Sequence, residues 1–320
     1  MATATGGVQR DTGQRPARAP GGSGTPRRRA IRREGLAGWA FSLPFLIIFV
    51  VFMAGPVLAS FAMSFTDLRS RDLRNPLAVN PVGLDNYTRL LEDDTFKQAS
   101  INTLYFVVVG VPLTMALGLA AAVGLNSGIN KFRTFFRVGY YLPVVTSIVA
   151  VAVVWRFLLE PQGGIINTLL GYIGIDGPNW LTNPATAMPS LIVMAAWRNM
   201  GFLMVIFLAG LQAIPRSLYE AASIDGASTW GQFRNITLPM MRPTLLFGGV
   251  ITGIGYLQVF EEPFVMTQGG PLDKTLTLAF YIYNQFGFGN YSYAAAISYV
   301  LFVAIVIFTI AQFRLLGSKS

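Results

Sequence analysis

The 320-residue chain contains no cysteine and no histidine, and only 12% of its residues are charged. The absence of cysteine excludes disulfides, thiolate nucleophiles, iron–sulfur ligation and thiolate zinc sites. The absence of histidine removes the usual general base and the commonest metal ligand. A soluble domain carries about a quarter charged residues. Together these absences exclude much of soluble enzymology.

The chain is instead rich in long apolar stretches, and 53% of its residues are hydrophobic. A helix crosses the hydrocarbon core of a bilayer with about 20 mainly apolar residues. The sequence therefore predicts an all-α polytopic membrane protein. Five stretches contain no Asp, Glu, Lys or Arg, namely 35–66, 98–130, 138–155, 243–260 and 275–313.

Six transmembrane helices are predicted from these stretches, and counts of five and seven remain open. The first half of 275–313 is interrupted by Asn284, Gly287 and other loop formers, so we expect a loop or a short surface helix there. Prolines inside the spans, such as Pro143, should kink them locally. The predicted spans are 38–64, 101–125, 138–159, 188–212, 243–263 and 293–313.

Lys and Arg are distributed unequally between the connecting segments. The segments 1–34, 126–137, 213–242 and the tail after 313 carry 16 basic and four acidic residues, whereas the other three loops carry seven basic and 11 acidic ones. Basic loops face the cytoplasm. Both termini are therefore predicted to be cytoplasmic. Segment 1–34 abuts the first span, so its arginines are interpreted as a topology signal on a disordered tail, not as a nucleic-acid contact.

One cytoplasmic segment carries an ordered series of helix signals. Ser217 and Glu220 have capping-box spacing, which predicts a helix that starts at Ser217. Gly226 suits the left-handed position that ends such a helix. Pro239 or Pro243 suits the first turn of the next span. Local physics alone thus predicts a helix-turn-helix loop.

The whole segment is more specific than these parts. It resembles the cytoplasmic loop of ABC-importer permeases, whose pattern is E-A-A, three residues, G, nine residues and I-x-L-P. The flanking segments 210–215 and 267–271 resemble the carbohydrate-uptake branch, which includes the maltose and glycerol-3-phosphate permeases. The resemblance covers about residues 36–315. The matching residues are Glu220, Ala221, Ala222, Gly226, Ile236, Leu238 and Pro239.

The resemblance implies a type I ABC importer permease fold with a defined organisation. Residues 1–34 form the tail, 35–98 the first transmembrane helix and an extracytoplasmic loop, and 99–316 the permease core with its coupling loop 213–242. In that family the first helix of the loop docks on a cytoplasmic ATPase, whose closure on ATP switches the permease between inward- and outward-facing states. The implied coupling residues are Leu218, Glu220, Ala221, Ala222, Asp225, Gly226 and Trp230.

The resemblance also implies the partners and the solute. The chain would form half of a translocation pathway for a sugar or a glycerol-phosphate-like solute. It would assemble with a homologous second permease, a dimer of ATP-binding subunits and an extracytoplasmic solute-binding protein in the lipid bilayer of a bacterial cytoplasmic membrane. No phosphate-binding P-loop occurs in the sequence, so ATP and Mg²⁺ would belong to the ATPase. We expect no cofactor, metal, catalytic residue or nucleic-acid partner for this chain.

Arg198 is the one full charge placed deep inside a predicted span, away from its ends. A charge there must face protein or water. It either lines the pathway beside Asn199 or pairs with an acid near the outer end of the span, Glu160, Glu261 or Glu262. Both interpretations stay open at this stage.

The fifth predicted span offers a second face for the pathway. Thr252, Tyr256, Val259 and Pro263 are spaced as one stripe of a helix, which also fits plain helix packing. By resemblance to sugar permeases, the solute contacts would come from two spans. They are Arg198, Asn199, Phe202, Thr252, Tyr256 and Val259.

Two other classes of protein compete with this interpretation. A stand-alone ion- or proton-coupled carrier usually places acids or histidines within the membrane, and it often shows a duplicated half. This chain has no histidine, and its nearest acids lie at span ends. An integral-membrane enzyme would need paired carboxylates, a metal cluster or a nucleophile with its base, and the predicted spans contain none of these.

Overall fold

The structure is a computed structural model that describes residues 39–74, 79–127 and 132–316. The predicted disordered tail, 1–34, lies outside these residues, as do both termini. Within the described ranges the chain is helical and has no β-strand, and Thr66 and Pro81 form an isolated antiparallel bridge. The mainly helical architecture predicted from composition is confirmed.

The helices begin with an α-helical segment over 39–49. The elements that follow are η1 (a π-helix, Val50–Ala54), α2 (Gly55–Met63), η2 (a 3₁₀-helix, Ser70–Arg74), α3 (Asp85–Glu92), α4 (Asp94–Ser127), α5 (Arg133–Val145), α6 (Ile148–Leu158), α7 (Ile165–Tyr172), α8 (Ala187–Gln212), α9 (Arg216–Ile224), α10 (Thr229–Gln232), η3 (a π-helix, Phe233–Thr237), α11 (Leu238–Met240), α12 (Arg242–Leu257), α13 (Glu261–Met266), α14 (Leu278–Gly287) and α15 (Tyr291–Leu316).

Four helices in the described residues are long and apolar enough to cross a membrane. They are Trp39–Met63, Asp94–Asn126, Ala187–Gln212 and Tyr291–Arg314. The pair α5 and α6 makes a fifth candidate if it counts as one span. Helix α12 has 16 residues, fewer than the roughly 20 that a straight span needs. The count of six spans therefore stays a prediction.

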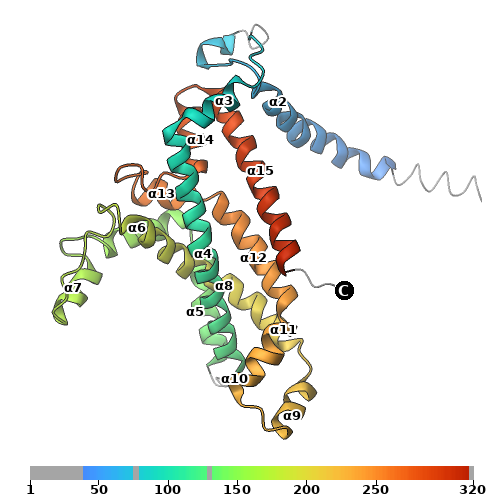
Figure 1. The fold of residues 1–320 in the computed structure, drawn as a ribbon, viewed down its shortest axis with the longest axis vertical. Coiled ribbons are helices and arrows are strands. Elements are labelled where there is room, and N and C mark those ends of the chain that lie inside the picture. Colours follow the sequence, from blue (N-terminus) through green and yellow to red (C-terminus); the bar gives the residue numbers. More distant parts are fainter. Residues whose placement is uncertain (1–38, 75–78, 128–131, 317–320) are drawn as a thin grey trace, which may run out of the picture. The chain divides into compact units, whose positions relative to one another are not determined.

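The chain divides into two compact units, 1–58 and 59–320. In the first, the described residues 39–58 form an apolar helical segment with no buried residue. In the second, α4 packs along α8, α12 packs against α4 and α15, and α5 packs against α8. Figure 1 shows α9 at one end of this unit and α3 and α14 at the other.

Two apolar clusters hold the second unit together. One contains the fully buried Phe106 of α4 and Leu191 of α8. The other contains Phe207 of α8 and Met241, just before α12. Helix α8 contributes to both clusters, which makes it the central element of the unit.

The predicted single span 138–159 is wrong in shape, because α5 and α6 meet at an angle of 100°. Pro143 has no N–H to donate within α5. The Thr146 hydroxyl donates to the Leu142 carbonyl oxygen at 2.9 Å, and the backbone at Thr146 and Ser147 is extended. The kink expected from Pro143 is thus a sharp break that falls three residues later.

Helices α3 and α4 are separated by a single residue, Asp93. One oxygen of its carboxylate accepts hydrogen bonds from the backbone N–H groups of Thr95 and Phe96, which caps the start of α4. The other accepts from the hydroxyls of Tyr281 at 2.6 Å and Tyr293 at 2.5 Å. Burial tends to raise the pKa of Asp93, but these four donors outweigh it and hold that pKa below its usual range. One ionised side chain thus joins α4, α14 and α15.

The segment 275–290 contains the short helix that its composition predicted, α14. Its position is less superficial than expected, because Leu278, Phe280 and Tyr281 are buried. The helix packs against α15 and α4. Thr277 caps its first turn, accepting a hydrogen bond from the Phe280 N–H at 3.4 Å.

Candidate functional site

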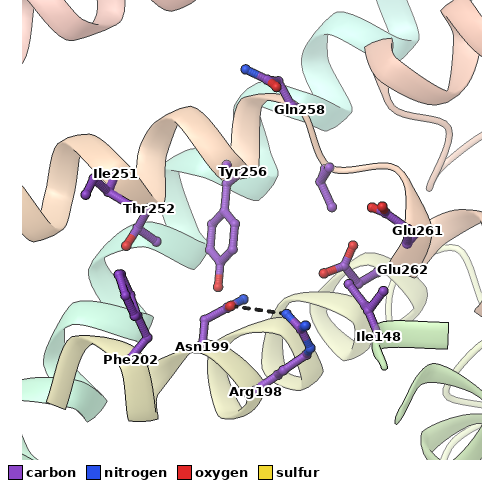
Figure 2. A pocket seen from close by; sticks show the side chains of 12 residues that line it. Ile148, Arg198, Asn199, Phe202, Ile251, Thr252, Tyr256, Gln258, Glu261 and Glu262 are labelled. Atoms are coloured by element: carbon purple, nitrogen blue, oxygen red, sulfur yellow. Dashed lines mark hydrogen bonds between the residues drawn. The ribbon is translucent and has the colours of Figure 1, made fainter. Parts of the chain in front are cut away.

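A pocket of about 300 Å³ lies between α8, α12 and the start of α13 (Figure 2). All six residues predicted for the solute pathway line it. Two segments that are about 50 residues apart in the sequence are therefore brought together as the resemblance implied. The lining residues are Ile148, Arg198, Asn199, Phe202, Ile251, Thr252, Gly255, Tyr256, Gln258, Val259, Glu261 and Glu262.

Helix α8 contributes Arg198, Asn199 and Phe202, which are all partly buried. Asn199 is held by its own helix, since its side-chain amide donates to the Ala195 carbonyl oxygen at 2.9 Å. Its amide oxygen accepts a long hydrogen bond of 3.4 Å from an Arg198 terminal nitrogen. The amide and the guanidinium therefore present a joined polar surface to the pocket.

Helix α12 contributes Thr252 and Tyr256, and the phenol ring of Tyr256 points across the pocket toward Asn199 (Figure 2). The Tyr256 hydroxyl lies 2.7 Å from the Thr114 hydroxyl of α4. Thr114 in turn donates to the Gly110 carbonyl oxygen. The ring packs edge-on against Phe106 at 5.0 Å between centroids. Helix α4 thus fixes the orientation of this tyrosine.

The close approach of α4 and α12 depends on Gly110. A Cβ atom at this position would lie 2.9 Å from the Tyr256 ring, which is closer than packed atoms tolerate. The contact between Thr114 and Tyr256 spans 142 residues. No local pattern in the sequence marks Thr114, so this residue was missed.

The predicted stripe Thr252, Tyr256, Val259 and Pro263 is wrong as a single helix face, because α12 ends at Leu257. The ring of Pro263 would clash with the Val259 carbonyl of a continuous helix, and Pro263 could not donate to it. That carbonyl accepts a hydrogen bond of 2.7 Å from the Thr277 hydroxyl instead. Val259 still lines the pocket from the break.

The break brings two acidic side chains of α13 to the pocket, Glu261 and Glu262. Glu262 is 4% exposed. Arg198 shares this pocket with both of them, whereas Glu160 lines a separate cavity beside Arg156. Among the described residues no carboxylate lies within 4.0 Å of the Arg198 nitrogens. Arg198 therefore forms no direct ion pair with Glu160, Glu261 or Glu262 in this part of the chain, although one of its two interpretations had expected such a pair.

The loop 213–242 forms four short helical elements, α9, α10, η3 and α11, and side-chain contacts join α9 to α10 and to η3. Helix α9 ends in a Schellman motif, with Gly226 at a φ of 79° and the Ala227 N–H donating to the Ala222 carbonyl oxygen at 2.9 Å. The Tyr219 hydroxyl lies 2.9 Å from the Thr237 hydroxyl. The side-chain amide of Gln232 donates to the Ser223 hydroxyl at 2.9 Å. The predicted role of Gly226 in ending the helix is confirmed.

The predicted capping box at Ser217 is wrong. Helix α9 begins at Arg216 with Pro215 as its N-cap residue, and no side chain caps it. The extended backbone of Pro215 starts the helix earlier, which places Ser217 at the second helical position. A side-chain cap occurs later in the loop, where Ser228 accepts a hydrogen bond from the Gly231 N–H at 3.2 Å.

The predicted coupling residues lie on the surface of this braced loop. Ala222 is half-buried, and the other six are exposed. Trp230 is 69% exposed and stacks on Phe233 with 5.5 Å between ring centroids. Ile224, which was not predicted, is 87% exposed. The loop thus exposes apolar side chains together with two carboxylates, those of Glu220 and Asp225. Its helix α9 lies at one end of the unit (Figure 1).

The described residues contain no group of three or more acidic side chains that could hold a metal ion. The pocket instead presents hydroxyl, amide, guanidinium and carboxylate groups beside two aromatic rings. Such groups hydrogen-bond and stack on a polar organic molecule.

Proteins of similar sequence are permeases of solute-import systems. The chain is 39% identical over 282 residues to the lactose transport system permease protein LacF of Rhizobium radiobacter, covering 86% of this chain and 92% of that protein. It is 36% identical over 285 residues to the arabinooligosaccharides permease AraP of Bacillus subtilis, covering 88% and 89%. It is 34% identical over 282 residues to the trehalose/maltose permease MalF of Thermococcus litoralis, covering 88% and 94%.

Solved structures agree with these relatives. The fold matches a chain in the crystal structure of a bacterial alginate ABC transporter in complex with an alginate pentasaccharide-bound periplasmic protein, with a TM-score of 0.76 and 27% identity over 89% of this chain and 95% of that one. A family profile described as the binding-protein-dependent transport system inner membrane component matches residues 114–315. The chain belongs to this family of inner-membrane transport permeases.

Proposed function

We propose that this chain is the permease subunit of an ATP-driven, binding-protein-dependent sugar importer, and that its pocket contacts the sugar in transit. The observation that carries the proposal is the convergence of the six predicted pathway residues on one pocket between α8 and α12. Hydroxyl and amide groups beside aromatic rings suit a sugar, whose ring faces stack while its hydroxyls hydrogen-bond. The sugar-transport permeases among the relatives support the same solute class.

The membrane topology that we propose has six crossings and two cytoplasmic termini. The crossings are the segment 39–63, α4, the bent pair α5 and α6, α8, α12 and α15. The excess of Lys and Arg in the segments that this topology places inside supports it. The position of α9 at the end of the unit opposite α3 and α14 agrees with the same assignment (Figure 1).

The energy for transport would arrive through the loop 213–242. Its internal hydrogen bonds make it rigid enough to pass a movement of the ATPase on to the transmembrane helices. Its exposed Leu218, Ile224 and Trp230 offer apolar anchors for a partner. The partner would be a dimer of cytoplasmic ATP-binding subunits that hold ATP and Mg²⁺. A homologous second permease and an extracytoplasmic solute-binding protein would complete the assembly.

The proposal predicts that Tyr256→Phe changes transport without weakening assembly. The substitution removes the one hydroxyl that Thr114 holds at the pocket and keeps the buried ring. Loss of one hydrogen bond of about 1 kcal/mol should raise the KM for sugar about 5-fold. KM is measured by uptake into proteoliposomes that contain the full complex and its binding protein.

Tyr281→Phe is the matched control for this experiment. It also removes a tyrosine hydroxyl, one that donates to Asp93, just before α4, instead of facing the pocket. We expect its KM to equal that of the wild type. An unchanged KM and unchanged sugar preference in Tyr256→Phe would move the solute site to the second permease.

A further inference from the structure

The charged groups of the pocket do not balance. Its lining contains two carboxylates, Glu261 and Glu262, against one guanidinium, that of Arg198. Figure 2 shows all three side chains at the same end of the pocket, where α13 faces α8. Glu262 is almost fully buried there, whereas the neighbouring Glu261 is exposed.

Arg198 retains an unused donor at this end. Its Nε atom is buried and has no hydrogen-bond partner among the described residues. The hydrogen bond from an Arg198 terminal nitrogen to Asn199 is long at 3.4 Å. A buried donor without a partner costs free energy, so the protein alone leaves the hydrogen-bonding capacity of Arg198 incompletely satisfied.

A sugar hydroxyl matches both kinds of group at this end. It accepts from the Arg198 guanidinium and donates to a carboxylate of Glu261 or Glu262. A phosphate or carboxylate on the solute can only accept. It would gain one partner in Arg198 and lie beside the acidic side chains of Glu261 and Glu262, where juxtaposed like charges are strongly unfavourable.

We propose that Glu261 and Glu262 make this pocket selective for neutral sugars over sugars that carry a phosphate or a carboxylate. This inference rests on the proposed function and narrows it, because it excludes a glycerol-phosphate-like solute. The two acids act by repulsion, which is a recognised route to specificity. They become part of the pocket only because the chain breaks after Leu257.

The test uses the assembled complex in lipid nanodiscs without the binding protein, so that only the permease selects. Binding is measured by ligand-observed NMR for matched pairs of probes: lactose with lactobionate, and trehalose with trehalose 6-phosphate. Wild type should bind a neutral sugar at least about 10-fold more tightly than its charged partner. The double variant Glu261→Gln and Glu262→Gln should reduce this ratio about 10-fold.

Two further variants make the outcome decisive. Glu160→Gln removes a carboxylate from the neighbouring cavity and should keep the wild-type ratio. Glu261→Gln alone changes an exposed side chain, so it should assemble even if the double variant does not, and it should lower the ratio partway.

The possible failures point to different claims. The selectivity proposal is overturned if wild type binds neutral and charged probes equally. It is also overturned if the ratio is unchanged in both the Glu261→Gln variant and the double variant at Glu261 and Glu262. Either result leaves the proposed sugar site intact. Absence of binding by every neutral probe, together with an unchanged KM in Tyr256→Phe, overturns the proposed function and this inference with it.

Discussion

A complex whose permease carries Glu220→Ala should show at least about 30-fold slower ATP-driven sugar uptake than wild type, the effect of losing about 2 kcal/mol at an interface. Glu220 is exposed on α9, and within the described part of the chain its carboxylate makes no hydrogen bond or ion pair. Its removal should therefore cost the fold little. The loss of uptake would arise at the contact with the ATPase, where the Glu220 carboxylate, surrounded by apolar side chains, aligns the surfaces of the loop and the ATPase.

The measurement is uptake into proteoliposomes together with co-purification of the ATPase. Glu92→Ala is the control, because Glu92 is also exposed, on α3 at the other end of the unit (Figure 1).

Gly226→Leu should act in the same direction as Glu220→Ala. A non-glycine residue at its φ of 79° costs about 1–2 kcal/mol and would distort the end of α9. Normal uptake by both loop variants would contradict the proposal that this loop docks on the ATPase.

A chain with Gly201→Ala should be markedly less stable than wild type, because α5 and α8 touch at this glycine. An added Cβ would lie 1.9 Å from the Tyr140 carbonyl oxygen and 3.1 Å from the Tyr141 Cα. Both neighbours are backbone atoms, so only a separation of the two helices relieves the overlap. Such overpacking costs about 1–3 kcal/mol or more.

Thermal unfolding of the purified complex measures this effect, and we expect a fall in unfolding temperature of about 5 °C or more. Gly139→Ala is the matched control on α5, one residue before Tyr140, where an added Cβ meets no atom within 4 Å. Alanine is a better helix former than glycine, so this control should be unchanged or slightly stabilised. Equal unfolding temperatures for the two variants would contradict the close helix contact.

The sequence predicted well the features that depend on local chemistry. Stretches without charge located α4 and α15, an apolar stretch with the single charge Arg198 located α8, and the spacing of Glu220 and Gly226 located the loop between α8 and α12. The pocket residues on α8 and α12 were found by counting from these motifs. The predictions of the spans and the loop need only charge patterning and fixed spacing along one chain, whereas the pocket residues also rest on the resemblance to sugar permeases.

The features that were missed depend on contacts between distant segments. The stripe that included Val259 and Pro263 assumed a straight helix, whereas Thr277 captures the Val259 carbonyl and α12 stops. That break brings Glu261 and Glu262 into the pocket. Helix periodicity alone places these two residues at the outer end of a span. Thr114 is likewise invisible until α4 packs against Tyr256.

The central claim is that this chain forms a passage whose energy comes from a separate ATPase through the loop 213–242. The most direct test is uptake of a neutral sugar by proteoliposomes that contain the chain with or without its second permease, ATPase and binding protein. We predict uptake only with the full assembly, Mg²⁺ and ATP, and none with an ion gradient alone. Uptake by this chain alone, driven by an ion or proton gradient, would contradict the account.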